Sequence, residues 1–529
     1  MKSYILTLLI FLPLLASLMM LFVPLLKQQK NNGLYRWIAL IASGIQLVLV
    51  SILYLNFDPS LSLPQSNISN PTDYVVQLPW IESFNIEYFI GVDGLSFPMV
   101  FLTALLTFIC VIASWNITKH PLAYFALFML LDTGMMGVFL ALDFFLFYIF
   151  WEVMLLPMYF LIGLWGGPQR KYAAIKFFLY TLFGSVFLLL GMIGLYYYSG
   201  ENTFNMIRLI ALAPSIEATL WGMDVTYLIW IALFIGFAIK VPIFPFHTWL
   251  PLAHVEAPTS ISVILAGVLL KMGTYGFLRI SYPILPMEVV TFAYILAILG
   301  LINIIWGATN AIAQYDLKKM VAYSSISHMG YVLLGMSAVI STSPAGSQAG
   351  MNGAVMQMFN HGTITAMLFL LVGMLYDRAH HRWIVYPNDY EDDKLAGKIG
   401  FGGIANVMPI FSGFIVLTFF AGLGLPSLSG FISEALCFIG GFSVFKVITI
   451  FATLGILLNA VYFLRAYQRV FMGEVNDKYS DLTDISKREI ATLVPLAIFV
   501  IGFGVYPSPL INVISPAMQN IIDTIQKFV

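Results

Sequence analysis

The sequence predicts an all-α protein that crosses a membrane about fourteen times, and three observations indicate this fold class. Of the 529 residues, 60% are hydrophobic and only 10% are charged, whereas ordinary globular chains carry about 25% charged residues. Apolar runs of about 20 residues, long enough to cross a bilayer, follow one another along the chain. The seventh and the twelfth of these runs are interrupted in the same way, around proline. The composition therefore excludes a soluble multidomain enzyme.

The expected spans are apolar runs bounded by charged or turn-forming residues. In chain order they cover residues 4–26, 34–54, 94–115, 122–140, 144–165, 174–198, 225–254, 260–280, 289–313, 321–340, 351–376, 404–438, 448–471 and 490–506. After the last run, residues 510–529 have apolar side chains at roughly helical spacing. This tail fits either a helix on the membrane interface or a disordered segment.

Lysine and arginine gather in alternate loops between the expected spans. Lys119 follows the third span, Arg170 the fifth and Lys318 the ninth, and Arg488 precedes the fourteenth. The intervening loop at 56–91 has acidic residues and neither lysine nor arginine. Because cytoplasmic loops are enriched in these two basic residues, we expect the basic loops in the cytoplasm and both termini outside it.

Proline interrupts the seventh and twelfth expected spans, at Pro242 and Pro245 and at Pro426. Proline breaks a helix, and non-helical backbone at membrane depth persists only inside protein or beside a hydrated cavity. Broken helices five spans apart predict two five-helix repeats, the second inverted; the alternative is a pair of ordinary proline kinks. The expected parts are 1–120 (helices 1–3 with an extracytoplasmic loop), 121–285 (helices 4–8), 286–475 (helices 9–13) and 476–529 (helix 14 and the amphipathic tail).

Four charged residues lie far from the ends of the expected spans: Glu152, Lys240, Lys271 and Glu434. A charge at the bilayer centre costs at least about 2.5 to 3.5 kcal/mol, so each of them needs a reason. The functional interpretation is a proton relay, in which the distance between Glu152 and Lys240 sets whether the lysine holds its proton. The alternative is a set of static ion pairs that serve assembly.

Histidine and one further acid extend this set. His328 and His361 are the central candidates for carrying protons between the charged residues, and His254 and His247 lie near the break in the seventh span. Each of them could instead be an ordinary packing residue. Asp132, inside the fourth span, is either a proton-path carboxylate or a hydrogen-bonded structural acid.

Several other kinds of site are excluded. Cys110 and Cys437 stand far apart in apolar runs, so no disulfide framework, thiolate-held zinc or iron–sulfur cluster is expected. No metal-spaced histidine pair or glycine-rich phosphate loop is present. A net charge of −1 provides no basic footprint for nucleic acid. We therefore expect no cofactor-binding or metal site in this chain.

Three long stretches resemble the subunit M (subunit 4) family of respiratory complex I, the NADH-quinone oxidoreductase. They are residues 150–163, FWEVMLLPMYFLIG; residues 246–273, which begin FHTWLPLAHVEAPT and end VLLKMG; and residues 316–328, DLKKMVAYSSISH. The resemblance extends from about residue 92 to residue 471 and implies an antiporter-like subunit of fourteen helices with two inverted repeats. It also implies a multi-pass protein of the bacterial inner (plasma) membrane.

The resemblance assigns roles to single residues. It implies that Glu152 is the family's helix-five glutamate, Lys240 its broken-helix lysine, Lys271 its helix-eight lysine and Glu434 its helix-twelve glutamate. It implies that the family's central histidines are His328 and His361. The chain departs from the family pattern in a looser stretch before Glu434 and in Asp132, where a neutral polar residue is expected.

The resemblance further implies partners and an activity. The chain would pump protons as a non-redox subunit of a translocase, with no catalytic centre of its own. Quinone, FMN and iron–sulfur clusters would belong to partner subunits, and the chain would lie in the lipid bilayer beside other membrane subunits, including sister antiporter-like ones. Two alternatives stay open: a subunit of a multisubunit sodium/proton antiporter, and a membrane anchor whose buried charges only fix assembly.

Overall fold

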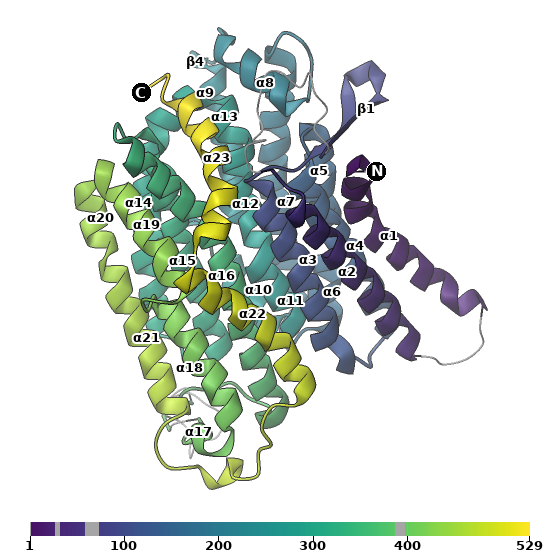
Figure 1. The fold of residues 1–529 in the computed structure, drawn as a ribbon, viewed down its shortest axis with the longest axis vertical. Helices are drawn as coiled ribbons and strands as arrows, with labels where there is room; N and C mark the ends of the chain where they lie inside the picture. The colour runs from purple at the N-terminus through teal and green to yellow at the C-terminus, as the bar shows by residue number, and fades with distance from the viewer. Residues whose placement is uncertain (1, 27–31, 59–73, 387–396, 399) are drawn as a thin grey trace.

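The computed structural model describes residues 2–26, 32–58, 74–386, 397–398 and 400–529. The described chain is a bundle of long helices that run mainly along one axis, as Figure 1 shows. Two small antiparallel hairpins, β1 (Val75–Ile81) with β2 (Ile86–Gly91) and β3 (Thr219–Leu220) with β4 (Met223–Asp224), are its strands. β1 and β4 are at the upper end in Figure 1, and α17 is at the lower end. The predicted outer loop lies partly outside the described residues, at 59–73.

The helices follow the order of the expected spans. The first part of the chain forms α1 (Lys2–Leu26), α2 (Asn32–Leu55), η1 (Glu82–Phe84), α3 (Ser96–Ala113) and η2 (Ser114–Asn116). The expected first repeat forms α4 (Pro121–Leu140), α5 (Phe144–Val153), α6 (Leu155–Trp165), α7 (Arg170–Tyr198), α8 (Met206–Leu212), η3 (Ala213–Ser215), α9 (Val225–Lys240), α10 (Trp249–Glu256), α11 (Thr259–Ile264), η4 (Leu265–Leu269), α12 (Leu270–Gly276), η5 (Phe277–Ser281) and α13 (Tyr282–Ile284). The expected second repeat forms α14 (Pro286–Ile312), α15 (Leu317–Ser337), η6 (Ala338–Ile340), α16 (Pro344–Ala379), α17 (Ile404–Val407), α18 (Pro409–Leu423), α19 (Ser429–Val444), α20 (Lys446–Ala452) and α21 (Leu454–Val470). The chain ends with η7 (Asp477–Tyr479), α22 (Lys487–Val505) and α23 (Ser508–Ile525).

The predicted all-α membrane fold is confirmed. Within the described residues, 11 helical segments are long and apolar enough to cross a bilayer. The three remaining predicted spans correspond to α15, to the broken pair α9 and α10, and to the broken pair α18 and α19. Both broken helices are therefore where proline predicted them. The division of the chain at residues 120, 285 and 475 stays a prediction.

The break in the seventh span is held by a side chain of a neighbouring helix. α9 ends at Lys240, and α10 begins nine residues later at Trp249. The backbone N–H of Phe244 donates to Asn303 Oδ1 at 2.8 Å, and Asn303 Nδ2 donates to the carbonyl of Pro242 at 3.3 Å. Asn303 thus pairs two backbone groups that the broken helix leaves free, as a buried backbone requires.

The break in the twelfth span is built in a similar way. α18 ends at Leu423 and is capped by Gly424, whose φ of +83° is the left-handed conformation that glycine adopts freely at a helix end. Asn360, from α16, donates to the carbonyl of Ser429 at 2.8 Å and to the hydroxyl of Ser433 at 3.1 Å. These bonds attach the first turn of α19 to α16. Glu434 is on the same helix, α19.

The fifth span is also interrupted, which the sequence analysis did not predict. α5 ends at Val153 and α6 begins at Leu155, so the interruption, at Met154, lies two residues after Glu152. Pro157 explains it, because its ring clashes with the carbonyl four residues earlier, at Val153, and provides no N–H to bond to that carbonyl.

Two fully enclosed helices form the centre of the bundle: the span α11–α13 and the long helix α16. The span α11–α13 includes two π-helical turns, η4 and η5, which flank Lys271. Glycine lets the two central helices approach closely, since a Cβ at Gly362 would lie 3.0 Å from the carbonyl oxygen of Gly267. This approach places Lys271 next to His361.

The C-terminal tail is helical, and the disordered alternative is wrong. α23 runs over the upper part of the bundle, as the bright yellow ribbon of Figure 1 shows, and its Ile514 and Met518 are completely buried. Asn352 of α16 donates to Ser515 Oγ at 2.8 Å. The apolar face of the tail therefore packs on the bundle itself.

Candidate functional site

Lys271 and His361 form the innermost polar contact of the bundle. The Nζ atom of Lys271 lies 2.7 Å from Nδ1 of His361 and also donates to the carbonyl of Ala266. Both side chains are buried, at 0% and 2% exposure. Because an ammonium group has only donors, His361 Nδ1 must be the acceptor while the lysine is charged.

His328 and Glu434 form the next contact, on α15 and α19. His328 Nδ1 lies 3.1 Å from Glu434 Oε1, and both side chains are buried. The ring of His328 lies 5.6 Å from that of His361, measured between centroids. The four side chains therefore form a continuous line, Lys271–His361–His328–Glu434, which we call the central line.

The widest step of the central line borders a small cavity. A cavity of about 10 Å³ is lined by His328, His361, Thr365 and Glu434, among others. This volume is about what one water molecule needs, provided that polar partners surround it. His361 Nε2 has no hydrogen-bond partner within the described structure. A single water at this place would connect the two rings.

Glu152 and Lys240 lie apart in this structure. Lys240 Nζ is buried without a hydrogen-bond partner among the described residues and lies 4.9 Å from the centroid of the Trp151 ring. The two residues interact electrostatically but do not form an ion pair within 4.0 Å. Trp151 donates to Ser185 Oγ at 3.1 Å, which fixes its ring between the helices. The lysine is thus held by a cation–π contact.

The other predicted histidines have different surroundings. His254 is completely buried and stacks on Phe369 at 4.6 Å, and neither of its ring nitrogens has a partner in the described part of the chain. It interacts electrostatically with Lys271 and Lys318. His247 Nε2 accepts from Trp306 Nε1 at 3.1 Å, at the edge of the bundle. The structure brings His254 next to the central line and leaves His247 at the break.

Asp132 is not part of the central line. It lies in α4, fully buried, and accepts a hydrogen bond of 2.7 Å from Thr107 of α3. Its contacts are with α2 and α3 rather than with the broken helices.

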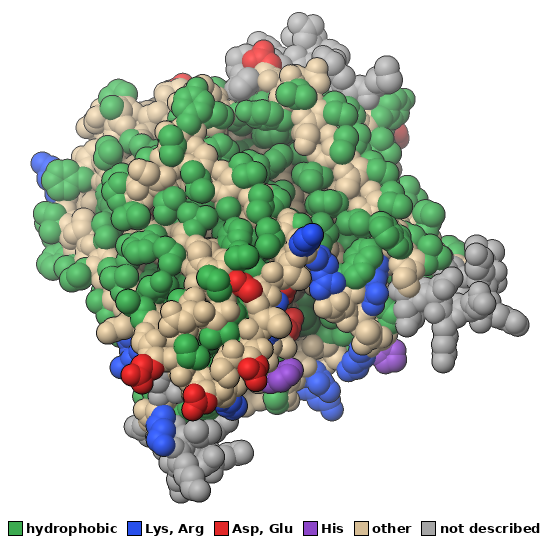
Figure 2. All heavy atoms as spheres, turned by 60° about the horizontal axis from the view of Figure 1, so that its bottom comes forward, with side chains coloured by type: hydrophobic (Ala, Val, Ile, Leu, Met, Phe, Trp, Pro, Cys, Tyr) green, Lys and Arg blue, Asp and Glu red, His purple; other side chains and the backbone are tan. Residues whose placement is uncertain are grey.

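The predicted basic loops share one face of the bundle, which has a large polar cavity. The cavity measures about 570 Å³ and is lined by residues of several loops and helix ends, including Asn116, Pro168, Glu256, Lys318, Arg382 and Arg488. Figure 2 shows lysine, arginine, aspartate and glutamate side chains gathered around a hollow on this face. We call this cavity the basic-face vestibule. Val255 and Glu256, which follow His254 in the chain, line it together with Lys318, which interacts electrostatically with His254.

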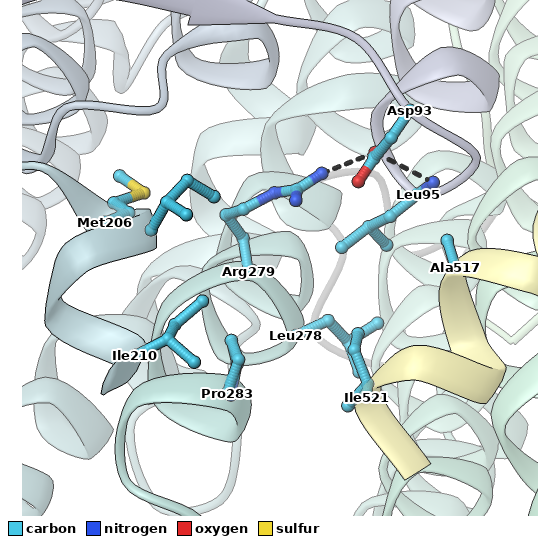
Figure 3. Close-up of a pocket in the computed structure, with 10 residues that line it drawn as sticks. Asp93, Leu95, Met206, Ile210, Leu278, Arg279, Pro283, Ala517 and Ile521 are labelled. Atoms are coloured by element: carbon cyan, nitrogen blue, oxygen red, sulfur yellow. Dashed lines mark hydrogen bonds and ion pairs between the residues drawn. The ribbon is translucent and has the colours of Figure 1, made fainter. Parts of the chain in front are cut away.

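Two polar elements near the site were missed by the sequence analysis. Asn303 bonds to the backbone at the break after Lys240, as described above. Its signal in the sequence is a lone asparagine in an apolar span. Arg279 of η5 pairs with Asp93 at 2.5 Å, both buried, next to Ala517 and Ile521 of α23 (Figure 3). Nothing in the sequence links Arg279 to a partner 186 residues away.

Metal-ligating clusters are absent from the part of the chain that the structure describes. No group of three or more His, Cys, Asp or Glu side chains is arranged there to hold a metal ion. The arrangement of the central line supports proton transfer between titratable side chains, which needs no metal.

Two family models match this chain. Residues 141–459 match the family model described as NADH:quinone oxidoreductase/Mrp antiporter, TM, and residues 72–142 match that of the NADH-ubiquinone oxidoreductase chain 4 amino terminus. The chain is 40% identical to NADH-quinone oxidoreductase subunit M of Rickettsia conorii, over 97% of either chain. It is 38% identical to the subunit M of Rhodobacter capsulatus, over 98% of this chain and 96% of the relative.

A solved structure has the same fold over its full length. A chain of respiratory complex I from Thermus thermophilus with bound NADH superposes with a TM-score of 0.82 and 26% identity. The match covers 98% of this chain and 99% of that chain.

Proposed function

Because this chain belongs to the NADH:quinone oxidoreductase/Mrp antiporter transmembrane family, on its subunit M branch, we propose that it is the antiporter-like, proton-translocating subunit of a bacterial-type NADH-quinone oxidoreductase. The central line is the observation that carries this proposal. Four titratable side chains follow one another in a line inside an apolar bundle, where each charge is costly.

The chain moves protons and leaves electron transfer to its partners. Quinone, FMN and iron–sulfur clusters belong to other subunits, and this chain provides no catalytic centre of its own. Its neighbours in the bilayer are other membrane subunits of the complex, including sister antiporter-like ones. The protein lies in the inner (plasma) membrane with the basic-face vestibule toward the cytoplasm and both termini on the opposite side.

Proton transfer along the central line follows from the hydrogen-bonding roles of its members. Lys271 gives a proton to Nδ1 of His361 and becomes a neutral amine. His361 then releases the proton on Nε2 toward the small cavity, and a water there passes a proton to His328. His328 passes its proton on Nδ1 to Glu434, which becomes a neutral acid. Each step moves one proton and leaves no net change of charge along the line.

Glu152 and Lys240 control this line as a switch. In the separated state described above, Lys240 rests on Trp151 without its carboxylate partner. Approach of Glu152 favours the charged lysine, and separation favours release of its proton. A redox event elsewhere in the complex that moves this pair would therefore set whether Lys240 holds the proton that the pathway passes on toward Lys271 and Glu434.

The sodium/proton antiporter alternative is less well supported. The family model covers both classes, but the relatives from Rickettsia conorii and Rhodobacter capsulatus, which match over nearly the whole chain, are subunit M proteins. The charged residue on α19 is a glutamate, Glu434, where the sister antiporter-like subunits have a lysine, and this also resembles the subunit M family.

Replacing Lys240 with alanine tests the proposal. The complex with Lys240→Ala, reconstituted in vesicles, should assemble and bind its partners, while proton translocation per electron pair collapses. Lys446→Ala is the matched control, because Lys446 is an exposed lysine at the start of α20. The proposal is wrong if the variant complex pumps normally. If assembly fails and the residual complexes pump normally, the anchor alternative holds.

A further inference from the structure

Asp132 is a buried acid without a positive partner. It is the twelfth residue of α4, which places it about 16 Å from the start of that helix and near the middle of the membrane. Its side chain is fully buried. Thr107 Oγ1 donates to its Oδ1 at 2.7 Å, and its Oδ2 has no hydrogen-bond partner in the described structure.

Asp93 provides the contrast. That carboxylate is equally buried but lies 2.5 Å from the guanidinium of Arg279 and accepts two backbone N–H bonds, from Leu95 and Ser96. No described lysine, arginine or histidine forms an ion pair with Asp132. An isolated ionised carboxylate in such surroundings costs far more than neutralisation. Asp132 therefore favours the neutral, protonated form, whereas Asp93 has a buried positive partner.

The surroundings of Asp132 suit a neutral acid. The side chains that interact with it are Thr107 of α3 and Gln46 of α2. Gln46 is itself completely buried, and its Oε1 is an acceptor without a donor among the described residues. A protonated Asp132 provides an O–H donor in a region where buried acceptors outnumber donors.

A row of polar side chains on α3 leads from Asp132 to the basic-face vestibule. Ser114, Cys110 and Thr107 are spaced by four and three residues, so they lie on one face of the helix. Cys110 donates to the carbonyl of Ser260 at 3.5 Å. Ser114 Oγ lies 2.9 Å from Tyr124 OH and donates to Ser260 Oγ at 2.8 Å. Ser114, Tyr124 and Ser260 all line the vestibule.

We propose that Asp132 is a second proton-binding site of this protein, held as a neutral carboxylic acid and loaded from the basic-face vestibule along the Ser114–Cys110–Thr107 face of α3. The site goes beyond the proposed function, because no contact of Asp132 joins the central line. A proton that arrives on Thr107 Oγ1 releases the hydroxyl hydrogen of that residue to Asp132 Oδ1. Rotation of the carboxyl group then turns the protonated oxygen toward Gln46.

Infrared difference spectroscopy of the assembled complex tests whether Asp132 is protonated. The spectrum of the native complex minus that of Asp132→Asn should contain the C=O stretch of one protonated carboxylic acid at neutral pH. Asparagine has the same shape and no charge, so the variant should assemble normally. A carboxylate signal in its place, or no difference at all, would contradict the proposal.

Hydrogen–deuterium exchange tests the route. On transfer to D₂O, the Asp132 signal should shift, and Thr107→Val should slow this shift by about tenfold or more, because it removes the hydroxyl beside the acid. Thr133→Val is the matched control, since Thr133 follows Asp132 in α4 and bonds only to the carbonyl of Met129. An unchanged exchange rate in Thr107→Val would overturn the route. Lys240→Ala should leave both the signal and its exchange unchanged, so a failure of the proposed function is distinguishable from a failure of this inference.

Discussion

Lys271 and His361 come from different central helices and meet at 2.7 Å between Nζ and Nδ1, in the most enclosed part of the bundle. Ninety residues separate them along the chain. The contact depends on the close approach of η4 to α16 at Gly267 and Gly362. It makes the histidine the acceptor of the lysine's proton, and so gives the central line its first step.

Replacing His361 with phenylalanine should therefore reduce coupled proton translocation strongly. The ring shape is retained, but the ammonium of Lys271 keeps only the carbonyl of Ala266 as a partner. Leaving a buried polar group unpaired costs about 1 to 3 kcal/mol, which corresponds to a roughly 5- to 150-fold effect. The measurement is the initial rate of proton uptake by vesicles during quinone reduction. A variant that pumps at the native rate would exclude His361 from the path.

Asn303→Leu should impair the switch without touching any titratable residue. The change removes the acceptor for the N–H of Phe244 and the donor for the carbonyl of Pro242. The freed backbone should no longer fix the end of α9, so the position of Lys240 relative to Glu152 becomes variable. We expect a fall in protons moved per electron pair, with assembly retained. Asn310→Leu is the control, because the side chain of Asn310, half-buried in the same helix, bonds only to the carbonyl of Trp306. An equal fall in both variants would contradict a specific role for Asn303.

Much of this fold follows from the sequence, because the bilayer fixes the length of each span and proline marks the breaks. Charges inside a membrane are costly and mark functional sites, so Lys271 and Glu434 can be identified as members of the central line from the sequence. The order of these residues in space does not follow, because it depends on glycine contacts between helices distant in sequence. The break after Glu152 was marked by Pro157 and was missed because the whole run is apolar.

Paired charges were harder to predict than single ones. Arg279 lies close to the end of its span, a position where a basic residue normally reaches the membrane surface. The structure instead buries it against Asp93, near α23 (Figure 3). Only a tertiary contact distinguishes the two situations, so neither composition nor spacing could have identified the pair.

His381 should make the stability of the loops on the basic face depend on pH. Its ring stacks on Phe401 at 4.3 Å and contacts Tyr479. Burial, with the nearby charge of Lys478, lowers the pKa of His381 to about 4, whereas an unfolded histidine has a pKa of about 6.5. The unfolded state therefore binds more protons between these values, so this contribution to stability is complete above about pH 6.5 and is lost as the pH falls toward about 4. Thermal unfolding of the native protein and of His381→Phe across this range should show the smaller pH dependence in the variant; parallel curves would contradict it.

Gly440→Ala should destabilise the helix pair that carries His361 and Glu434. A Cβ at Gly440, in α19, would lie 2.3 Å from the Cα of Gly350 in α16, and backbone atoms cannot yield as a flexible side chain does. Overpacking of this kind costs about 1 to 3 kcal/mol. Gly413→Ala is the matched control, because Gly413 lies in α18 of the same broken span and a Cβ there would meet nothing within 4 Å. Alanine inside a helix is more stable than glycine by about 0.5 to 1 kcal/mol, so the control substitution should be neutral or slightly stabilising. Thermal unfolding of the detergent-purified complex measures both variants, and a Gly440→Ala protein as stable as the control would mean that α16 and α19 are not in backbone contact.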